Sequence, residues 1–87
     1  MNTIDMLFSF VEGLTDEYSS TEYSIIKTKE RYIVEERRYD DFLEIYDLEA
    51  DDEMELEFNG EKVVFVCYEE SKDFLSEAYD NFIKNFN

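Results

Sequence analysis

The side chains that most often carry out catalysis are nearly absent from this chain. It has no histidine, so it lacks the commonest general base and the commonest nitrogen ligand of metal ions. Its one cysteine, Cys67, lies in an apolar segment and has no histidine that could activate the thiol. Neither a glycine-rich phosphate loop nor the spacing of a zinc site occurs. We therefore interpret Cys67 as a small buried apolar residue, and we expect the protein not to be an enzyme.

Carboxylates are the remaining groups that could do chemistry, and their number argues against singling out any one pair. The chain has 24 acidic residues, so two acids at the spacing of a glycosidase site would arise from composition alone. The acids of residues 49–53 offer oxygen ligands for calcium, but the spacing and the central glycine of an EF-hand loop are missing. We expect no catalytic site, no bound metal and no cofactor.

The distribution of the acids is more informative than their chemistry. The formal net charge is −16, and residues 40–61 contain eleven acids and no base. Such a field attracts basic surfaces and repels nucleic acid and anionic membranes. A surface that serves only solubility usually mixes both signs, so we expect this segment to bind a partner. The predicted binding residues are Asp40, Asp41, Glu44, Asp47, Glu49, Asp51, Asp52, Glu53, Glu55 and Glu57, with the flanking tyrosines Tyr39 and Tyr46.

Composition indicates one folded domain over residues 1–87. The chain is 44% hydrophobic and 17% aromatic and has no proline, which is typical of a packed domain and not of a disordered acidic segment. The lone cysteine excludes a disulfide within the chain and favours a reducing compartment. The N-terminus does not resemble a signal peptide, and no run approaches the roughly 18 apolar residues of a membrane span. We expect a cytoplasmic protein.

Helical periodicity predicts an element at each end of the chain. The first helix begins at Thr3, the expected N-cap, and the second follows Ser71, which we expect to cap it in the same way. The apolar stripe of the first helix contains Ile4, Leu7, Val11, Leu14 and Tyr18, and Phe8 and Phe10 widen it. The stripe of the second contains Phe74, Leu75, Ala78, Tyr79, Phe82 and Ile83.

The middle of the chain favours strands. β-branched and aromatic residues predict strands near 23–28 and 31–38, whereas residues 40–49 fit either a short helix or a strand, and we favour the strand. Residues 53–58 alternate glutamate with apolar residues, and Asn59-Gly60 then gives the strongest short hairpin signal. A two-residue turn at this point places Leu56 opposite Val63.

These elements predict an α+β fold in the order α-β-β-(β)-β-β-α. We expect an antiparallel sheet of four strands, or five with residues 40–49, flanked by N- and C-terminal helices that cover one face. The return strand of the hairpin, residues 61–68, is apolar on both faces, which indicates either a central position in the sheet or a strand covered by a helix on one side and by a partner on the other.

Two known groups of proteins share features with the chain. Residues 37–42, Arg-Arg-Tyr-Asp-Asp-Phe, resemble the RRYSDF signature of phox-homology domains, which bind phosphoinositides. Asp40 stands where that signature has serine, the match spans six residues, and the acidic chain would repel an anionic membrane. We therefore expect no membrane partner.

The second resemblance is one of size, charge and order of elements, without an alignable motif. In these respects the chain resembles small acidic phage-encoded DNA-mimic inhibitors, which include anti-restriction, anti-CRISPR and uracil-glycosylase-inhibitor proteins. The resemblance implies stoichiometric inhibition of a basic nucleic-acid-binding protein, such as a nuclease or a CRISPR or restriction effector, with no direct binding of nucleic acid. Two alternatives stay open: an immunity or antitoxin protein that neutralises a basic toxin, and a structural or oligomerisation module, such as a homodimer, with an acidic solubility face.

Overall fold

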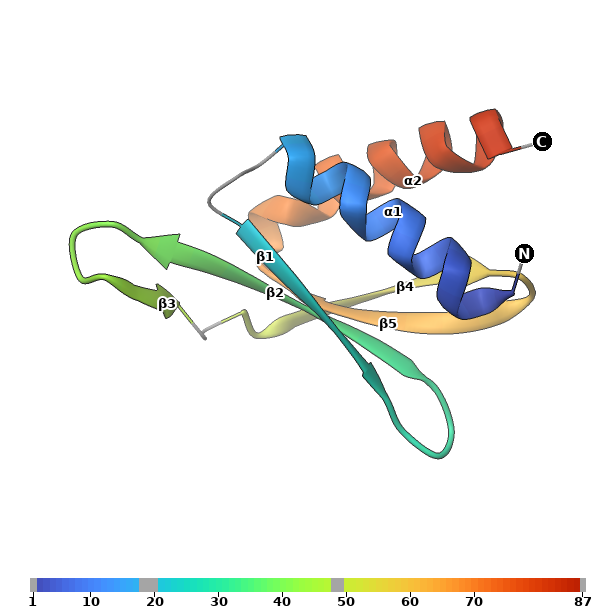
Figure 1. Cartoon of the computed structure of the whole chain (residues 1–87), viewed down its shortest axis with the longest axis horizontal. Coiled ribbons are helices and arrows are strands. Elements are labelled where there is room, and N and C mark those ends of the chain that lie inside the picture. The colour runs from blue at the N-terminus through green and yellow to red at the C-terminus, as the bar shows by residue number, and fades with distance from the viewer. Residues whose placement is uncertain (1, 18–20, 48–49, 87) are drawn as a thin grey trace.

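The computed structural model describes residues 2–17, 21–47 and 50–86, as two helices on one side of a twisted sheet (Figure 1). The elements are α1 (Thr3–Glu17), β1 (Thr21–Lys27), β2 (Tyr32–Asp40), β3 (Ile45–Asp47), β4 (Asp52–Phe58), β5 (Glu61–Cys67), the 3₁₀-helix η1 (Glu69–Ser71) and α2 (Lys72–Phe86). The predicted α+β class and the two terminal helices are confirmed. Tyr18 of the predicted first stripe and the side chains of Asp16, Glu17, Asp47 and Phe86 lie outside the described part.

The β4–β5 hairpin forms in the register that the sequence predicts. Asn59 and Gly60 have φ values of 52° and 80°, as the two central residues of a type I′ turn require. Leu56 pairs with Val63. The alternation of β4 therefore turns its apolar side chains toward the helices and its glutamates toward the opposite face.

The order of the strands corrects the prediction of an antiparallel sheet. It is β1-β2-β5-β4, with β3 also paired to β2, and β2 runs parallel to β5 while the other pairs are antiparallel. The reason lies in the two strands of the hairpin. The strand β5 is apolar on both faces and takes the central position, which leaves the glutamate-bearing β4 at the edge. With β5 inserted beside β2, the two strands run in the same direction.

Both helices pack on one face of the sheet and form one aromatic core with it. The ring of Phe10 in α1 lies 5.5 Å from Phe58 in β4 and 5.5 Å from Phe82 in α2, measured between ring centroids. The hydroxyl of Tyr79 in α2 also donates a hydrogen bond to the carbonyl of Glu57 in β4. The fully buried side chains of this core include Leu7, Val34, Phe58, Val63, Phe65, Cys67 and Leu75.

The helix caps differ in detail from the prediction. The side-chain oxygen of Asn2, not that of Thr3, accepts the hydrogen bond from the backbone N–H of Asp5, at 3.0 Å. Thr3 is already the first residue of α1 and is buried. Ser71 directly precedes α2, but its hydroxyl accepts a hydrogen bond from Arg38 of β2 at 2.8 Å. These side chains therefore join the helix ends to the rest of the fold.

Among the described residues of the segment 40–49, Asp40 ends β2, residues 41–44 form a turn and Ile45–Asp47 form β3, so the helical alternative is wrong for this part of the segment. The carboxylate of Asp40 accepts hydrogen bonds from the backbone N–H groups of Phe42 and Leu43, at 2.9 and 3.1 Å. The same two bonds can also start a helix, but Glu44 has a φ of 55°, in the left-handed region, which ends the segment as a turn. Residues 39–46, which we call the arm, project from the sheet beyond both helices (Figure 1).

Candidate acidic binding surface

An acidic row runs along the edge strand β4 on the face that the helices leave open. We use the name acidic row for Glu53, Glu55 and Glu57 of β4 and for Asp51, which directly precedes the strand; all four are exposed. Successive glutamates of the strand lie about 6.6–6.8 Å apart at the usual rise of a β-strand. Among the described residues, the ion pairs are Arg37–Glu35, Arg38–Glu70 and Lys72–Asp52, so none of them neutralises the row.

The row borders an apolar strip on the same open face. On β5, Val66 pairs with Glu53, Val64 with Glu55 and the cation Lys62 with Glu57. Although no helix covers it, Val64 is only 6% exposed. It lines a pocket of about 350 Å³ together with charged side chains of both signs. These come largely from the β1–β2 and β4–β5 turns, which lie at the same end of the sheet because Tyr32 pairs with Val63. The face therefore presents carboxylates beside a narrow apolar surface.

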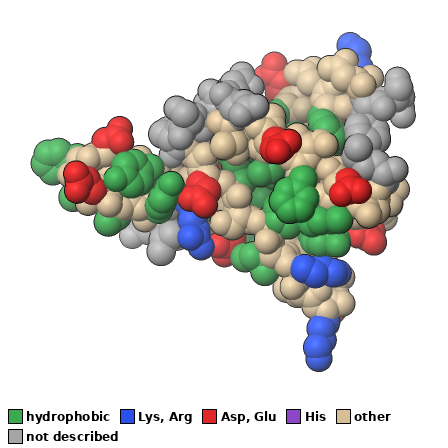
Figure 2. Space-filling model, in the orientation of Figure 1, with side chains coloured by type: hydrophobic (Ala, Val, Ile, Leu, Met, Phe, Trp, Pro, Cys, Tyr) green, Lys and Arg blue, Asp and Glu red, His purple; other side chains and the backbone are tan. Residues whose placement is uncertain are grey.

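Five of the remaining predicted residues lie on the arm. Tyr39, Asp40, Asp41, Glu44 and Tyr46 lie together on the arm and are exposed. The space-filling view shows hydrophobic and acidic side chains side by side at the tip of the arm (Figure 2). The predicted binding surface is thus divided between the arm and the acidic row.

Asp52 is the predicted residue that the fold turns to the other side. It pairs with Cys67 on the helix-covered face, and its carboxylate lies 2.8 Å from the ammonium group of Lys72 in α2. The hydrogen bond from Lys72 lowers the pKa of Asp52 and raises the pKa of Lys72. Asp52 therefore joins β4 to α2. Asp47 is the last residue of β3, and its side chain and Glu49 lie outside the described residues.

The two tyrosines of the arm contact each other across the β2–β3 pair. The rings of Tyr39 and Tyr46 are 5.1 Å apart between centroids and meet edge to face. A hydrogen bond to the carboxylate of Glu22 in β1 raises the pKa of the Tyr46 hydroxyl. These contacts hold the base of the arm against the sheet. Both tyrosines are among the residues that the sequence predicts to bind a partner.

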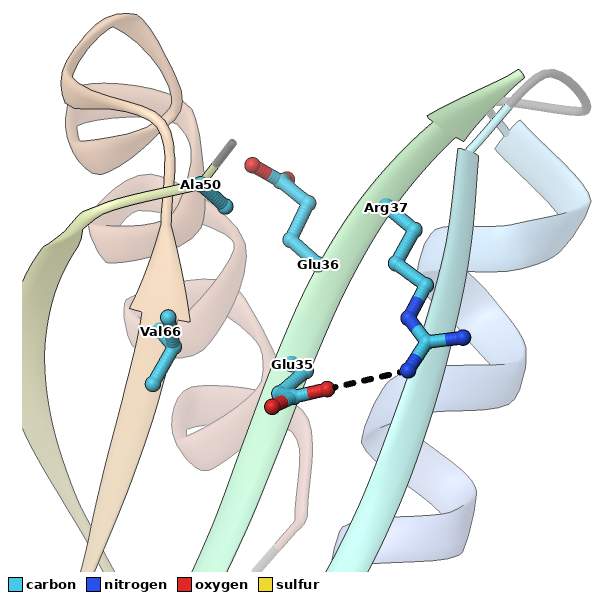
Figure 3. Close-up of a pocket in the computed structure, with 5 residues that line it drawn as sticks. All are labelled: Glu35, Glu36, Arg37, Ala50 and Val66. Atoms are coloured by element: carbon cyan, nitrogen blue, oxygen red, sulfur yellow. Dashed lines mark hydrogen bonds and ion pairs between the residues drawn. The ribbon is translucent and has the colours of Figure 1, made fainter. Parts of the chain in front are cut away.

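The two basic residues of β2, Arg37 and Arg38, interact with acids outside the acidic row. The guanidinium of Arg37 turns back along β2 to Glu35 at 3.2 Å, beside a pocket of about 200 Å³ (Figure 3). Arg38 lies 2.9 Å from Glu70 and stacks over the ring of Tyr68 at 4.3 Å. The field of the row is therefore not cancelled by these two bases.

Sequence reasoning missed a buried carboxylate, Glu36. It is 2% exposed, accepts a hydrogen bond from the hydroxyl of Tyr23 at 2.7 Å and accepts a second from the backbone N–H of Tyr68 at 3.1 Å. Burial, together with the hydrogen bond to Glu36, raises the pKa of the Tyr23 hydroxyl. The alternation of β2 carried a signal, because Glu36 falls on the same face as the buried Val34. The role of Glu36 is to connect β1, β2 and the segment after β5.

The sequence interpretation also did not assign binding to the apolar residues of the arm. Phe42 is 92% exposed, Leu43 is 59% exposed and Ile45 is 56% exposed. The available signal was the position of these residues among acids in a segment that fits no single amphipathic pattern. Their exposure adds an apolar component to the predicted surface.

Cys67 and the acidic residues are the described side chains whose chemistry bears on nucleophilic attack and metal binding. Burial raises the pKa of the Cys67 thiol to about 11, so this cysteine is a poor nucleophile at neutral pH. Nowhere in residues 2–17, 21–47 and 50–86 do three acidic or cysteine side chains converge in a way that could hold a metal ion. In the same ranges, neither helix has the length and apolar character needed to span a membrane.

The chain was also compared with known proteins. No protein-family model, no curated protein and no solved structure matches it. The geometry and the charge of the molecule therefore carry the functional argument.

Proposed function

We propose that this protein is a non-enzymatic inhibitor that occupies a basic nucleic-acid-binding channel of a nuclease or another DNA- or RNA-binding effector by imitating phosphates. The observation that supports the proposal is the acidic row on β4. Its four carboxylates are exposed and free of ion pairs within the described part of the chain, and Glu53, Glu55 and Glu57 share one side of a paired strand. On this proposal the inhibitor acts in the cytoplasm, as an anti-CRISPR or anti-restriction protein would.

Charge spacing gives the proposal a physical basis. A DNA strand carries one negative charge per roughly 3.4 Å of helix axis, and glutamates on one side of a β-strand provide about half that density. The acids of the arm add further negative charge to the same molecule. A rigid row of this kind binds a basic channel without the ordering cost that a flexible acidic segment would have.

An immunity protein that neutralises a toxic nuclease would use the same electrostatics, so the acidic row supports it equally. A structural module with an acidic solubility face makes a different prediction, because it requires no basic partner. Binding that weakens steeply as salt rises supports both inhibitor functions and contradicts the structural one. Genome neighbours distinguish an inhibitor of host defence from an immunity protein.

The proposal is tested by competition. The full-length chain is used to capture proteins from host lysate at low and high salt, and the captured protein is identified and purified. Duplex DNA and single-stranded RNA are then titrated against the complex. Nucleic acid should displace the inhibitor and should not bind the inhibitor itself, because like charges repel. Simultaneous binding of nucleic acid and inhibitor to the captured protein would refute phosphate mimicry.

A charge-reversed variant and a matched control identify the surface. Substitution of Asp51, Glu53, Glu55 and Glu57 by Lys should abolish binding and leave the fold intact, since these side chains are exposed. The control reverses four exposed acids elsewhere and changes the net charge equally; it carries Lys in place of Glu12, Glu69, Glu77 and Asp80. If both variants lose binding to the same extent, net charge and not the acidic row is responsible.

A further inference from the structure

The arm concentrates the exposed apolar side chains of the described structure. Among the described residues, seven large apolar or aromatic side chains are exposed. Five of these seven belong to the arm: Tyr39, Phe42, Leu43, Ile45 and Tyr46. Phe42, at 92% exposure, contributes almost its whole ring to solvent. An apolar cluster rimmed by polar groups at the end of a projecting hairpin is the kind of surface that proteins use for association.

The arm is held in shape by its own contacts before any partner binds. The carboxylate of Asp40 accepts hydrogen bonds from the backbone N–H groups of Phe42 and Leu43. At the base, the rings of Tyr39 and Tyr46 pack 5.1 Å apart. A binding element that is already ordered loses little conformational entropy on association, so its apolar side chains contribute more of their burial to affinity.

The acids beside the apolar residues restrict the identity of the partner. Asp40, Asp41 and Glu44 are exposed on the same turn as Phe42 and Leu43. This negative collar disfavours an anionic membrane, and a second copy of a chain with a net charge of −16 is disfavoured in the same way. The collar complements an apolar pocket whose rim carries Lys and Arg.

We propose that the arm is a hydrophobic anchor that inserts Phe42 and Leu43 into an apolar pocket with a basic rim on a protein partner. This goes beyond the proposed function, because apolar side chains contribute nothing to the imitation of phosphates. The acidic row supplies an attraction that salt weakens, whereas the anchor supplies a contribution that persists in high salt. The two surfaces can therefore be tested separately.

The first experiment maps what Phe42 touches. The probe is the full-length chain with p-benzoylphenylalanine in place of Phe42, irradiated in host lysate. The control probe carries the same residue in place of Phe8, an exposed aromatic on α1 that is 54% exposed. We expect a crosslink specific to position 42, and peptide mapping should locate it in an apolar pocket of another protein, flanked by Lys or Arg.

The other outcomes of this experiment overturn the proposal. A crosslink to a second copy of the chain identifies the arm as a self-association surface, and a crosslink to lipid identifies it as a membrane contact. A crosslink to a flat or acidic surface of the partner contradicts the proposed apolar pocket with a basic rim. A yield at position 42 no greater than that at position 8 shows that the arm is not a preferred contact.

The second experiment measures affinity for the crosslinked protein after its purification. Phe42→Ser should raise Kd about 30-fold, as the loss of an aromatic hot spot does, and the factor should be similar at 0.1 M and 0.5 M salt. Phe8→Ser is the matched control and should leave Kd unchanged. An unchanged Kd for Phe42→Ser refutes the anchor.

The anchor and phosphate mimicry fail in distinguishable ways. If nucleic acid competes and Phe42→Ser binds as tightly as the unmodified chain, the anchor is wrong and the proposed function stands. If Phe42→Ser weakens binding while nucleic acid does not compete, the anchor stands and phosphate mimicry is wrong.

Discussion

The helix-covered body and the arm use the same residue types for opposite purposes. In the body, the ring of Phe58 is fully buried and lies within 5.5 Å of Phe10 and 5.3 Å of Tyr79, measured between ring centroids. On the arm, Phe42 is 92% exposed. Aromatic content alone therefore does not locate the core. The contrast indicates that the body provides stability and that the arm is available for binding.

The polar contacts of the two regions differ in range as well. The buried carboxylate of Glu36 accepts hydrogen bonds from groups 13 and 32 residues away in the sequence. Asp40 also accepts two, but from the amides two and three residues further along. The body is thus held by contacts between distant segments, whereas the shape of the arm is largely a local property.

The comparison is tested most directly by removing one ring from each region. Phe58→Ala should lower the free energy of unfolding by about 3–5 kcal/mol, because it opens a cavity in the core. Phe42→Ala should change it by no more than about 0.5 kcal/mol, since an exposed ring leaves no cavity. Urea denaturation followed by circular dichroism measures both values. A large loss for Phe42→Ala would mean that the arm supports the fold.

A second pair of variants sharpens the comparison between buried and exposed carboxylates. Glu36→Leu leaves the hydroxyl of Tyr23 and the amide of Tyr68 without this acceptor, at a cost of about 1–3 kcal/mol for each unpaired donor. The control is Glu35→Leu, because Glu35 is half-exposed and its ion pair with Arg37 should contribute no more than about 1 kcal/mol. Equal losses in chemical denaturation would show that burial of Glu36 is not the cause.

The body should also respond to alkaline pH through Cys67. Burial raises the pKa of this thiol to about 11 from an ordinary value of 9.0, so the unfolded chain releases the proton first as pH rises. Stability that is fully present below pH 9 is then lost progressively up to about pH 11. Cys67→Ala should make the decrease in unfolding free energy over this interval shallower.

The hydroxyl of Tyr23, whose pKa is also raised, should preserve part of the alkaline decrease in that variant. An exposed thiol, introduced as Ser76→Cys into the Cys67→Ala chain, serves as the control. Its pKa should hardly differ between the folded and unfolded states, so it should not restore the slope. Parallel curves for the original chain and Cys67→Ala would exclude the buried thiol as a source of pH dependence.

The smallest expected effect concerns the repulsion among exposed acids. Salt screens charges over about 8–10 Å, so the melting temperature should rise between low and physiological salt. The rise should be smaller than the roughly 4–8 °C that corresponds to 1 kcal/mol in a domain of this size. The variant with Lys along the acidic row should show a flatter dependence. A melting temperature that stays constant or falls would mean that local bases already compensate the acids.

The elements whose signals are local could be predicted from the sequence. Asn59-Gly60 specified the hairpin and its register, and the periodic apolar stripes predicted both terminal helices. The acidic row was also predictable, because alternation along β4 places Glu53, Glu55 and Glu57 on one face wherever the strand lies. Whether these acids bind a partner stays a proposal, since neither the sequence nor the fold contains the partner.

Other features were decided only by the tertiary structure. The parallel pairing of β2 with β5, the ion pair between Asp52 and Lys72 and the burial of Glu36 all depend on segments far apart in the chain. The exposure of the arm also depends on the tertiary structure, because Phe42 stays in solvent where the arm extends beyond both helices (Figure 1). A sequence fixes local geometry through backbone preferences and side-chain period. Which faces are covered follows from how all the elements share one core, and no single segment carries that information.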